Sequence, residues 1–104
     1  MIISTIDKVP GKDILEILGV ARGSTVRAKN IGKDIFAVFK NIVGGEIQEY
    51  TKLQADSREE AIKRMVDDAE RLGADAILGV RLTTSMVTQG AAEILAYGTA
   101  VKLN

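Results

Sequence analysis

The sequence predicts one α+β domain, in which an antiparallel sheet of about four strands is packed by one long and one short helix. Apolar residues alternate with a period of two near both ends of the chain, which is typical of strands, and recur every three or four residues between them, which is typical of helices. The chain has 104 residues, the length of a single domain. Strands at both ends with helices between them predict the order ββααββ.

The first predicted strand covers residues 2–6, a short β-branched and apolar run. A turn follows over residues 7–12, where the single proline stands beside a glycine. Residues 14–28 predict a second, longer strand. Gly19 and Gly23 interrupt this strand, and we expect a bulge or bend at each of them.

Two helices are predicted next. Residues 31–43 carry apolar side chains at helical spacing, and Gly44-Gly45 ends that segment. Residues 47–72 form the clearest element, with charged side chains opposite a stripe of apolar or small ones, and Gly73 ends it. The capping pattern Ser57-Arg58-Glu59-Glu60 offers an alternative start for this helix. We favour one long helix because the stripe keeps its phase across Ser57, running through Ile47, Tyr50, Leu53, Ser57, Ala61, Met65, Ala69 and Leu72.

The last two predicted strands, residues 76–86 and 92–103, form an antiparallel hairpin around Gln89-Gly90. Both faces of the final strand are largely apolar, whereas one main helix can cover only one face of the sheet. Monomers rarely leave large apolar patches in water, so we expect a second copy of the chain to cover the other face. The alternative is that the short helix over 31–43 covers it.

Composition narrows the possible functions. The 14 basic and 14 acidic residues balance, without the basic excess that nucleic acid or an anionic membrane attracts. The chain has no cysteine and no histidine, which excludes disulfides, thiolate nucleophiles and the commonest transition-metal ligand. It lacks a signal peptide and a membrane span, so we expect a cytoplasmic protein.

Candidate ligand-binding residues lie mainly on the strands. Arg22 and Ser24 share one face of the second strand, Arg27 lies on the opposite parity, and Arg81 and Thr83 share a face of the third. These side chains could bind a small anion where subunits meet. Alternatively, the arginines pair with Glu16 or Glu93 across an interface. Tyr50 and Tyr97 could serve as hydrogen-bonding anchors. The full candidate set is Arg22, Ser24, Arg27, Tyr50, Arg81, Thr83, Glu93 and Tyr97.

Neither catalysis nor metal binding has a clear set of residues. No catalytic triad, Cys–His pair or carboxylate dyad can be assembled, so we expect a binding protein rather than an enzyme. No cofactor is evident. The three methionines are scattered, and Met65 belongs to the helical apolar stripe. The acidic pairs Glu59-Glu60 and Asp67-Asp68 are interpreted as solvated helix surface. A weak ion site formed where subunits meet stays open.

Several segments in register resemble one family of small bacterial and archaeal proteins, the YbjQ family, whose label attributes heavy-metal binding to it. The resemblance covers almost the whole chain, as a single domain over residues 1–104. The segments are Gly23-Ser24-Thr25-Val26-Arg27, Asn30-Ile31-Gly32-Lys33-Asp34-Ile35, Asn41-Ile42-Val43-Gly44-Gly45-Glu46, Tyr50-Thr51, Arg58-Glu59-Glu60-Ala61, Leu72-Gly73-Ala74-Asp75-Ala76-Ile77 and Ala96-Tyr97-Gly98-Thr99-Ala100-Val101.

The resemblance implies a dodecin-like subunit assembled into a homopentamer, with no established reaction. The chain has Asp75 where the family commonly has asparagine. It has Leu82-Thr83 where an aromatic and an acidic residue are frequent, which weakens any carboxylate site there. We therefore expect a pentameric binding or scaffolding protein with its ligand at subunit interfaces. A metal-ion binder is the alternative that the family label suggests.

Overall fold

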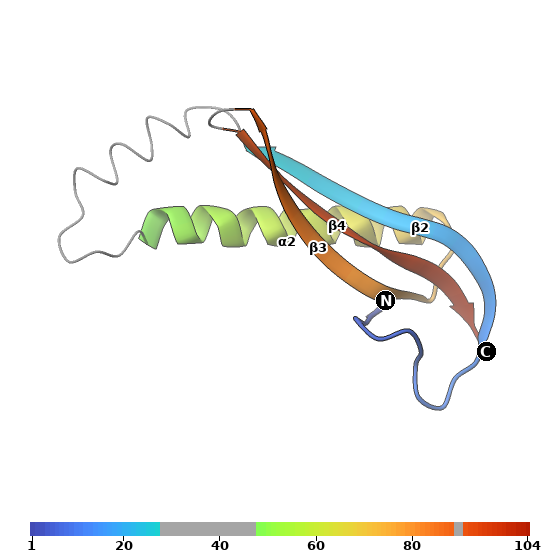
Figure 1. Ribbon diagram of the computed structural model, residues 1–104. Coiled ribbons are helices and arrows are strands. Elements are labelled where there is room, and N and C mark those ends of the chain that lie inside the picture. Colours follow the sequence, from blue (N-terminus) through green and yellow to red (C-terminus); the bar gives the residue numbers. More distant parts are fainter. Residues whose placement is uncertain (28–47, 89–90) are drawn as a thin grey trace.

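The computed structural model describes residues 1–27, 48–88 and 91–104, and the side chains within them except those of 27, 48–54, 87 and 88. In these residues the chain is α+β, with a four-stranded sheet and one long helix that runs along one face of it (Figure 1). The short predicted helix, residues 31–43, lies outside the described residues, which therefore show the order ββαββ. The elements are β1 (Ile2–Ile3), β2 (Ile14–Arg27), α2 (Gln48–Arg71), β3 (Ala76–Thr88) and β4 (Ala91–Leu103).

The sheet is mixed, so the prediction of a purely antiparallel sheet is wrong. Its strand order is β1-β3-β4-β2, and β1 pairs in parallel with β3 through the partners Ile2 and Ala76. The physical reason is the route of the chain, which passes from one edge of the sheet at β1 to the opposite edge at β2. The predicted turn on this route is confirmed, because the Lys12 N–H donates to the Val9 carbonyl at 3.1 Å and Gly11 has a φ of 80°.

The first strand is shorter than predicted, although the segment stays beside β3. The Ser4 N–H donates to the Ile77 carbonyl at 2.9 Å, and the Gly79 N–H donates to the Ile6 carbonyl at 3.0 Å. Regular pairing is lost because β3 has a register irregularity between Leu78 and Arg81, where Gly79 has a φ of 64°. The sequence reasoning missed this irregularity.

Of the two glycines expected to disturb β2, only one does so. The register of β2 against β4 shifts between Ile17 and Gly19, and Gly19 has a φ of 136°. Gly23 instead pairs regularly with Ala96. Its missing side chain serves the helix, because a Cβ there would overlap the backbone of Ala61 and Met65 and lie 2.6 Å from the Arg64 carbonyl carbon.

One face of the sheet packs on α2. The predicted stripe is confirmed for Ser57, Ala61, Met65 and Ala69, which are 2%, 0%, 0% and 0% exposed. The helix runs without a break through Ser57, as favoured. It ends in a Schellman motif in which Gly73, at a φ of 80°, and Ala74 donate to the carbonyls of residues 70 and 69. The core on this face comprises Ala21, Ala61, Met65, Ala69, Ile77, Val80, Ile94, Ala96 and Ala100.

The opposite face of the sheet, called the open face below, has a second and smaller apolar cluster. It consists of Ala76, Leu78, Val101 and Leu103, with Val9 of the N-terminal segment packed against it. The prediction that both faces of the last strand are largely apolar is confirmed, since Ile94 and Ala96 belong to the first cluster and Val101 and Leu103 to the second. Among the described residues, no helix has the length and apolar composition needed to cross a membrane.

Candidate functional site

The most distinctive polar feature of the open face is a row of three side chains across the sheet. Tyr97 of β4 is paired with Arg22 of β2 on one side and with Arg81 of β3 on the other. Directly opposed residues of antiparallel strands point to the same side of the sheet. All three residues are exposed, and Tyr97 retains 38% of its accessible surface. The Arg22–Tyr97–Arg81 row thus unites three predicted candidates.

The irregularity at Gly79 decides which face Arg81 occupies. Strict alternation along the predicted strand would put Arg81 on the same face as Ile77, four residues earlier. In the structure Ile77 packs in the helix-facing core, whereas Leu78 belongs to the cluster on the open face. The register resumes at Arg81 opposite Tyr97, so that Arg81 follows the face of Leu78. The irregularity therefore brings Arg81 onto the same face as Arg22, which alternation alone could not predict.

The two arginines of the row differ in how firmly they are held. The Arg81 guanidinium donates through Nη1 to the Thr5 carbonyl at 3.0 Å and to the Val80 carbonyl at 2.8 Å. These bonds tie its head group to the N-terminal segment. Within the described residues the Arg22 guanidinium has no hydrogen bond or ion pair, and only its backbone N–H is engaged, with Asp68 at 3.0 Å. One cation is thus fixed and the other is free to move.

A second row lies beside the first. Ser24 and Thr83 flank Leu95 of β4, again directly opposite one another across the central strand. Ser24 is half-buried and Thr83 is exposed. This row adds two hydroxyl groups, each able to donate and accept a hydrogen bond, next to the two guanidinium groups.

The remaining candidates do not join this group in the described part of the chain. Glu93 is paired with Val26 and Ser85 and stands four residues from Tyr97 along β4, roughly 13 Å at the rise of a strand. Within one subunit Glu93 is therefore too far from the row to pair with its arginines. Arg27 ends β2 and Tyr50 lies in the first turn of α2, but their side chains are outside the described residues.

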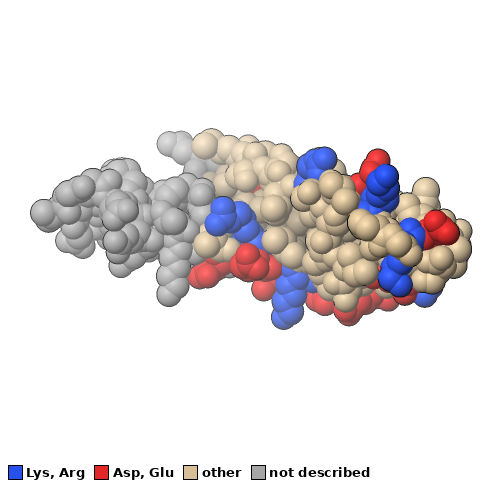
Figure 2. All heavy atoms as spheres, turned by 90° about the horizontal axis from the view of Figure 1, so that it is seen from below, with Lys and Arg blue, Asp and Glu red and all other residues tan. Residues whose placement is uncertain are grey.

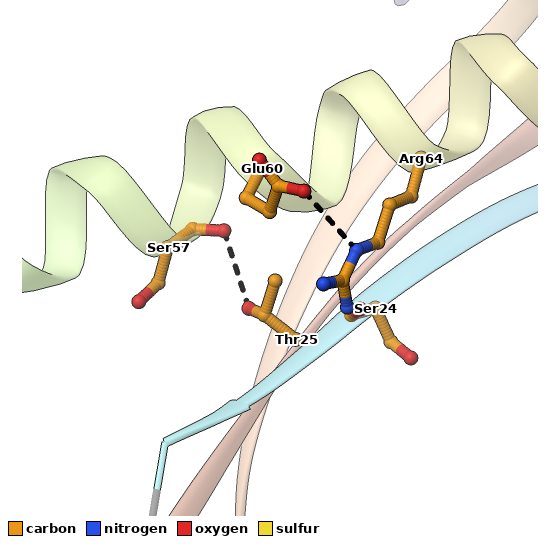
Figure 3. Close-up of polar contacts among 5 residues, drawn as sticks. All are labelled: Ser24, Thr25, Ser57, Glu60 and Arg64. Atoms are coloured by element: carbon orange, nitrogen blue, oxygen red, sulfur yellow. Dashed lines mark hydrogen bonds and ion pairs between the residues drawn. The ribbon is translucent and has the colours of Figure 1, made fainter.

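Arg64 and Asp68 connect α2 to the outer edge of β2, a role that the sequence reasoning missed; Figure 3 shows the position of Arg64. The Arg64 guanidinium donates from Nη1 to the Ser24 carbonyl at 2.6 Å and from Nε to Glu60 at 3.3 Å. Asp68, one turn further along the helix, accepts the Arg22 N–H. Below them the buried Thr25 hydroxyl donates to the Ser57 carbonyl at 3.2 Å. The charged residues at 60, 64, 68 and 71 have the spacing of solvated helix pairs, which concealed this role.

Asp68 is electrostatically adapted to its position. The hydrogen bond from the Arg22 N–H, helped by the Arg71 guanidinium, lowers the pKa of Asp68 below its ordinary value, against an opposing effect of partial desolvation. The Oδ1 atom of Asp68 accepts from Arg71 Nη2 at 3.2 Å. The interpretation of Asp68 as merely solvated helix surface is therefore corrected, because its carboxylate satisfies a backbone donor of the sheet edge.

The residues of this chain do not fit a heavy-metal site. Soft metals prefer thiolate, thioether or imidazole ligands, and the sequence has no cysteine and no histidine. Met65 is fully buried in the core, and Met86 is 78% exposed. The part of the chain that the structure describes has no group of three or more acidic side chains able to hold a metal ion. The donors gathered on the open face, arginine and hydroxyl groups, suit an anion instead.

Comparison with known proteins gives consistent matches along the chain. A family model described as "Putative heavy-metal-binding" matches residues 1–104. The chain is 59% identical over 103 residues to a UPF0145 protein of Methanosarcina acetivorans, covering 99% of this chain and 97% of that one. It is 56% identical over 101 residues to a UPF0145 protein of Clostridium perfringens, covering 97% and 95%.

A solved structure shares the fold. It is a protein of unknown function from Pediococcus pentosaceus, described as a member of the DUF74 family, with a TM-score of 0.57. It is 21% identical in sequence, and the match covers 100% of this chain and 98% of that chain. The family match along the whole length, together with identities above one half to several relatives, shows that the chain belongs to the YbjQ family, also called UPF0145.

Proposed function

We propose that this protein is a cytoplasmic, homo-oligomeric binding or scaffolding protein whose ligand lies where subunits meet. The observation that carries the proposal is the exposure of large apolar side chains along β2. Ile17, Val20 and Val26 are 70%, 61% and 54% exposed, and their partners Val101, Thr99 and Glu93 place all three on the open face. Ile17, paired with Val101, extends the apolar cluster of this face, and exposed apolar surface of this kind is typical of sites that another protein covers.

The open face is only partly covered by the chain itself in the described residues. Val9 packs on the cluster around Val101, near the start of β3 and the end of β4. From Val20 to Val26, the residues of β2 on this face stay exposed or half-buried. Figure 2 shows broad uncharged areas over the described part of the molecule, interrupted by scattered Lys and Arg side chains, with several acidic side chains along the lower border. A second copy of the same chain, carrying the same exposed apolar side chains, is the simplest cover.

The edge of β2 supports the same proposal. β2 is an outermost strand of 14 residues, and unpaired edge strands invite pairing with another chain. Side chains of α2 occupy this edge at Arg22 and Ser24. Residues 14–20 have no such contact from α2 among the described residues, and Leu15 there is 66% exposed. We propose the dodecin-like pentamer implied by the family resemblance as the assembled state.

The experiment is native mass spectrometry of the purified protein beside a Val20→Asp variant. The wild-type protein is expected as five copies of the 11.2 kDa chain. Val20 is exposed in the single subunit, so a charge there leaves the subunit's own core intact. In the assembly it would be buried without a partner, which is strongly unfavourable. The variant should therefore appear as a folded monomer by mass and by circular dichroism.

Leu72→Asp is the matched control. Leu72 is also an exposed apolar residue, at 40%, but it lies at the end of α2 and not on the open face. This variant should remain assembled. A wild-type protein that runs as an 11.2 kDa monomer at micromolar concentration would contradict the proposal. Loss of assembly in both variants would remove the assignment of the interface to the open face.

Metal-ion binding is the second candidate, and the family description is what favours it. Elemental analysis of the protein as isolated, before and after dialysis against a chelator, tests it directly. One tightly held metal ion per chain, or per assembly, would favour the metal role despite the unsuitable ligands. Metal at trace level, removed by the chelator without change in assembly, would leave the binding of a non-metal ligand as the better account.

A further inference from the structure

We propose that the Arg22–Tyr97–Arg81 row binds a phosphate-bearing small molecule through its phosphate group. The inference names the class of ligand for the binding role proposed above and rests on that role. It comes from the cross-strand register, which places one arginine on either side of one tyrosine, on the same face of the sheet.

The spacing of the row suits one oxyanion. The Arg22 N–H points outward to Asp68 and not toward β4, so Arg22 and Tyr97 form a non-hydrogen-bonded pair, with Cα atoms about 4.5 Å apart. Tyr97 and Arg81 then form a hydrogen-bonded pair, with Cα atoms about 5.5 Å apart. The two arginine Cα atoms are thus roughly 10 Å apart. Arg22 can turn across Tyr97 from this distance, toward a group that Arg81 contacts through its donors other than Nη1.

The charge of the row favours a phosphate over a neutral ligand. The row and the rows on either side of it contain two arginines and no carboxylate: their other members are Val20, Ser24, Leu78, Thr83, Leu95, Tyr97 and Thr99. The neighbouring Asp68 carboxylate already accepts from Arg71 and from the Arg22 backbone. The Arg22 charge also helps to lower the pKa of Asp68, but neither guanidinium group forms an ion pair in the described residues. Two such groups match the charge of −1.5 to −2 that a phosphate monoester carries near pH 7.

The two arginines have complementary roles in such a site. Arg81 uses Nη1 for the Thr5 and Val80 carbonyls, so its head group is positioned before a ligand arrives. Preorganisation of this kind reduces the entropy lost on binding. The Arg22 side chain has no hydrogen bond or ion pair among the described residues, although its charge helps to lower the pKa of Asp68, and it is free to turn onto the anion. Guanidinium groups bind phosphate through paired, charge-assisted hydrogen bonds.

The surroundings of the row provide for the rest of the ligand. Ser24 and Thr83 place a hydroxyl group beside each arginine, in the next row of the sheet. Leu95 lies between these hydroxyls, and Val20 extends the apolar surface on the other side of Arg22. An organic body attached to the phosphate can therefore lie on Leu95, while the phosphate stays with the arginines.

The test is calorimetric titration of the assembled protein with inorganic phosphate at constant ionic strength, together with NMR spectra of the arginine Nε–H groups. We expect saturable binding of one phosphate per chain, with shifts at Arg22 and Arg81. Arg22→Gln should weaken binding roughly 10- to 100-fold, the effect of losing hydrogen bonds to a charged group. Arg22→Lys should weaken it less, since the charge remains but the fork of donors is lost. Tyr97→Phe tests the phenol hydroxyl.

Arg58→Gln is the matched control, because Arg58 is exposed on the helix and its loss changes the net charge equally. It should leave phosphate binding unchanged. Arg22→Gln is expected to fold like the wild type, because the Arg22 side chain makes no hydrogen bond or ion pair in the described residues. At position 81 the variant is Arg81→Lys, which keeps the positive charge. Arg81→Gln would remove the charge and would also disturb the N-terminal segment, which Arg81 holds through the Thr5 carbonyl.

Native mass spectrometry of each variant separates the two proposals. An assembled wild-type protein without saturable phosphate binding overturns the ligand assignment and leaves the proposed assembly standing. Assembly lost in Arg22→Gln, with no phosphate bound by the wild type, means that the arginines form ion pairs between subunits. Equal weakening by Arg22→Gln and Arg58→Gln also overturns the site, because it shows only general charge attraction.

Discussion

Asp68 of α2 accepts, through Oδ2, a hydrogen bond from the backbone N–H of Arg22 on the outer edge of β2, at 3.0 Å. Four residues earlier on the helix, Arg64 donates to the Ser24 carbonyl at 2.6 Å on the same edge. The helix therefore does more than cover the sheet: it satisfies one donor and one acceptor of the strand that would otherwise be open to another chain. These contacts fix β2 beneath α2 and orient the strand that carries Arg22.

Replacement of Asp68 should weaken the fold in a pH-dependent way. Asp68→Ala removes a charge-assisted hydrogen bond and should lower the free energy of unfolding by about 1 to 2 kcal/mol near pH 7. The pKa of Asp68 is lowered in the folded protein from an ordinary value of 3.8. The carboxylate thus contributes its stability above pH 3.8, and the contribution is lost as the pH falls below 3.8 through the folded pKa.

Urea unfolding of the wild type and of Asp68→Ala across this pH range measures the effect. The difference between them should be constant near neutral pH and should shrink in acid. Asp67→Ala is the control, because it removes a neighbouring exposed carboxylate that makes no hydrogen bond to the sheet in the described residues. An equal effect of both substitutions would show that general charge, and not the bond to Arg22, is responsible.

Gly23→Ala should be the most damaging single-methyl change in the described part of the chain. The added Cβ would meet backbone atoms of Ala61, Arg64 and Met65, which can move only if the whole helix moves. We expect a loss of about 3 kcal/mol or more, at the upper end of overpacking effects. Gly98→Ala is the comparison, because its nearest neighbour is the Ile77 Cγ2 atom at 2.7 Å, the end of a side chain that can turn. Thermal unfolding that ranks Gly98→Ala as the worse variant would contradict this packing argument.

Asp75 ties the start of β3 to the end of β4. Its Oδ2 accepts the Leu103 N–H at 2.9 Å, and Oδ1 lies 3.7 Å from Lys102 Nζ. The hydrogen bond from Leu103, together with Lys102, lowers the pKa of Asp75 below its ordinary value. Asp75→Asn keeps an acceptor for Leu103, whereas Asp75→Ala has none.

We therefore expect the melting temperature to fall clearly in Asp75→Ala and only slightly in Asp75→Asn at pH 7. The advantage of the wild type over Asp75→Asn should disappear as the pH falls below 3.8 and the carboxyl group becomes protonated. It should also shrink in high salt, which screens the exposed pair with Lys102. Identical melting temperatures of Asp75→Ala and Asp75→Asn at pH 7 would show that the bond to Leu103 contributes nothing.

Arg64 should matter more for solubility than for stability. Its pair with Glu60 is largely exposed, with side-chain exposures of 54% and 40%, so its loss should cost no more than about 1 kcal/mol. Arg64→Ala nevertheless uncovers the Ser24 carbonyl on the edge of β2, and we expect faster aggregation on mild heating, followed by light scattering. Lys63→Ala, on the exposed side of the same helix turn, is the control and should aggregate at the wild-type rate.

The sequence by itself determined the elements that repeat with a clear period. The stripe of Ala61, Met65 and Ala69 predicted the long helix and its buried face, and the glycine at 73 predicted its end, because both depend on local spacing and backbone freedom. The two-sided apolar pattern of the last strand predicted that both of its faces would need to be covered. The candidate residues Arg22, Arg81 and Tyr97 were also identified from the sequence, although only as separate members of three strands.

Only the tertiary structure decided how these strands meet. The parallel pairing of β1 with β3 depends on the route of the chain across the end of the sheet. The irregularity at Gly79 reverses the alternation expected for Arg81 and places it opposite Tyr97. Gly23 was predicted to bend its strand, yet it gives space to the helix. Each of these depends on contacts between residues far apart in the chain, whereas sequence periodicity reports only on neighbours within one element.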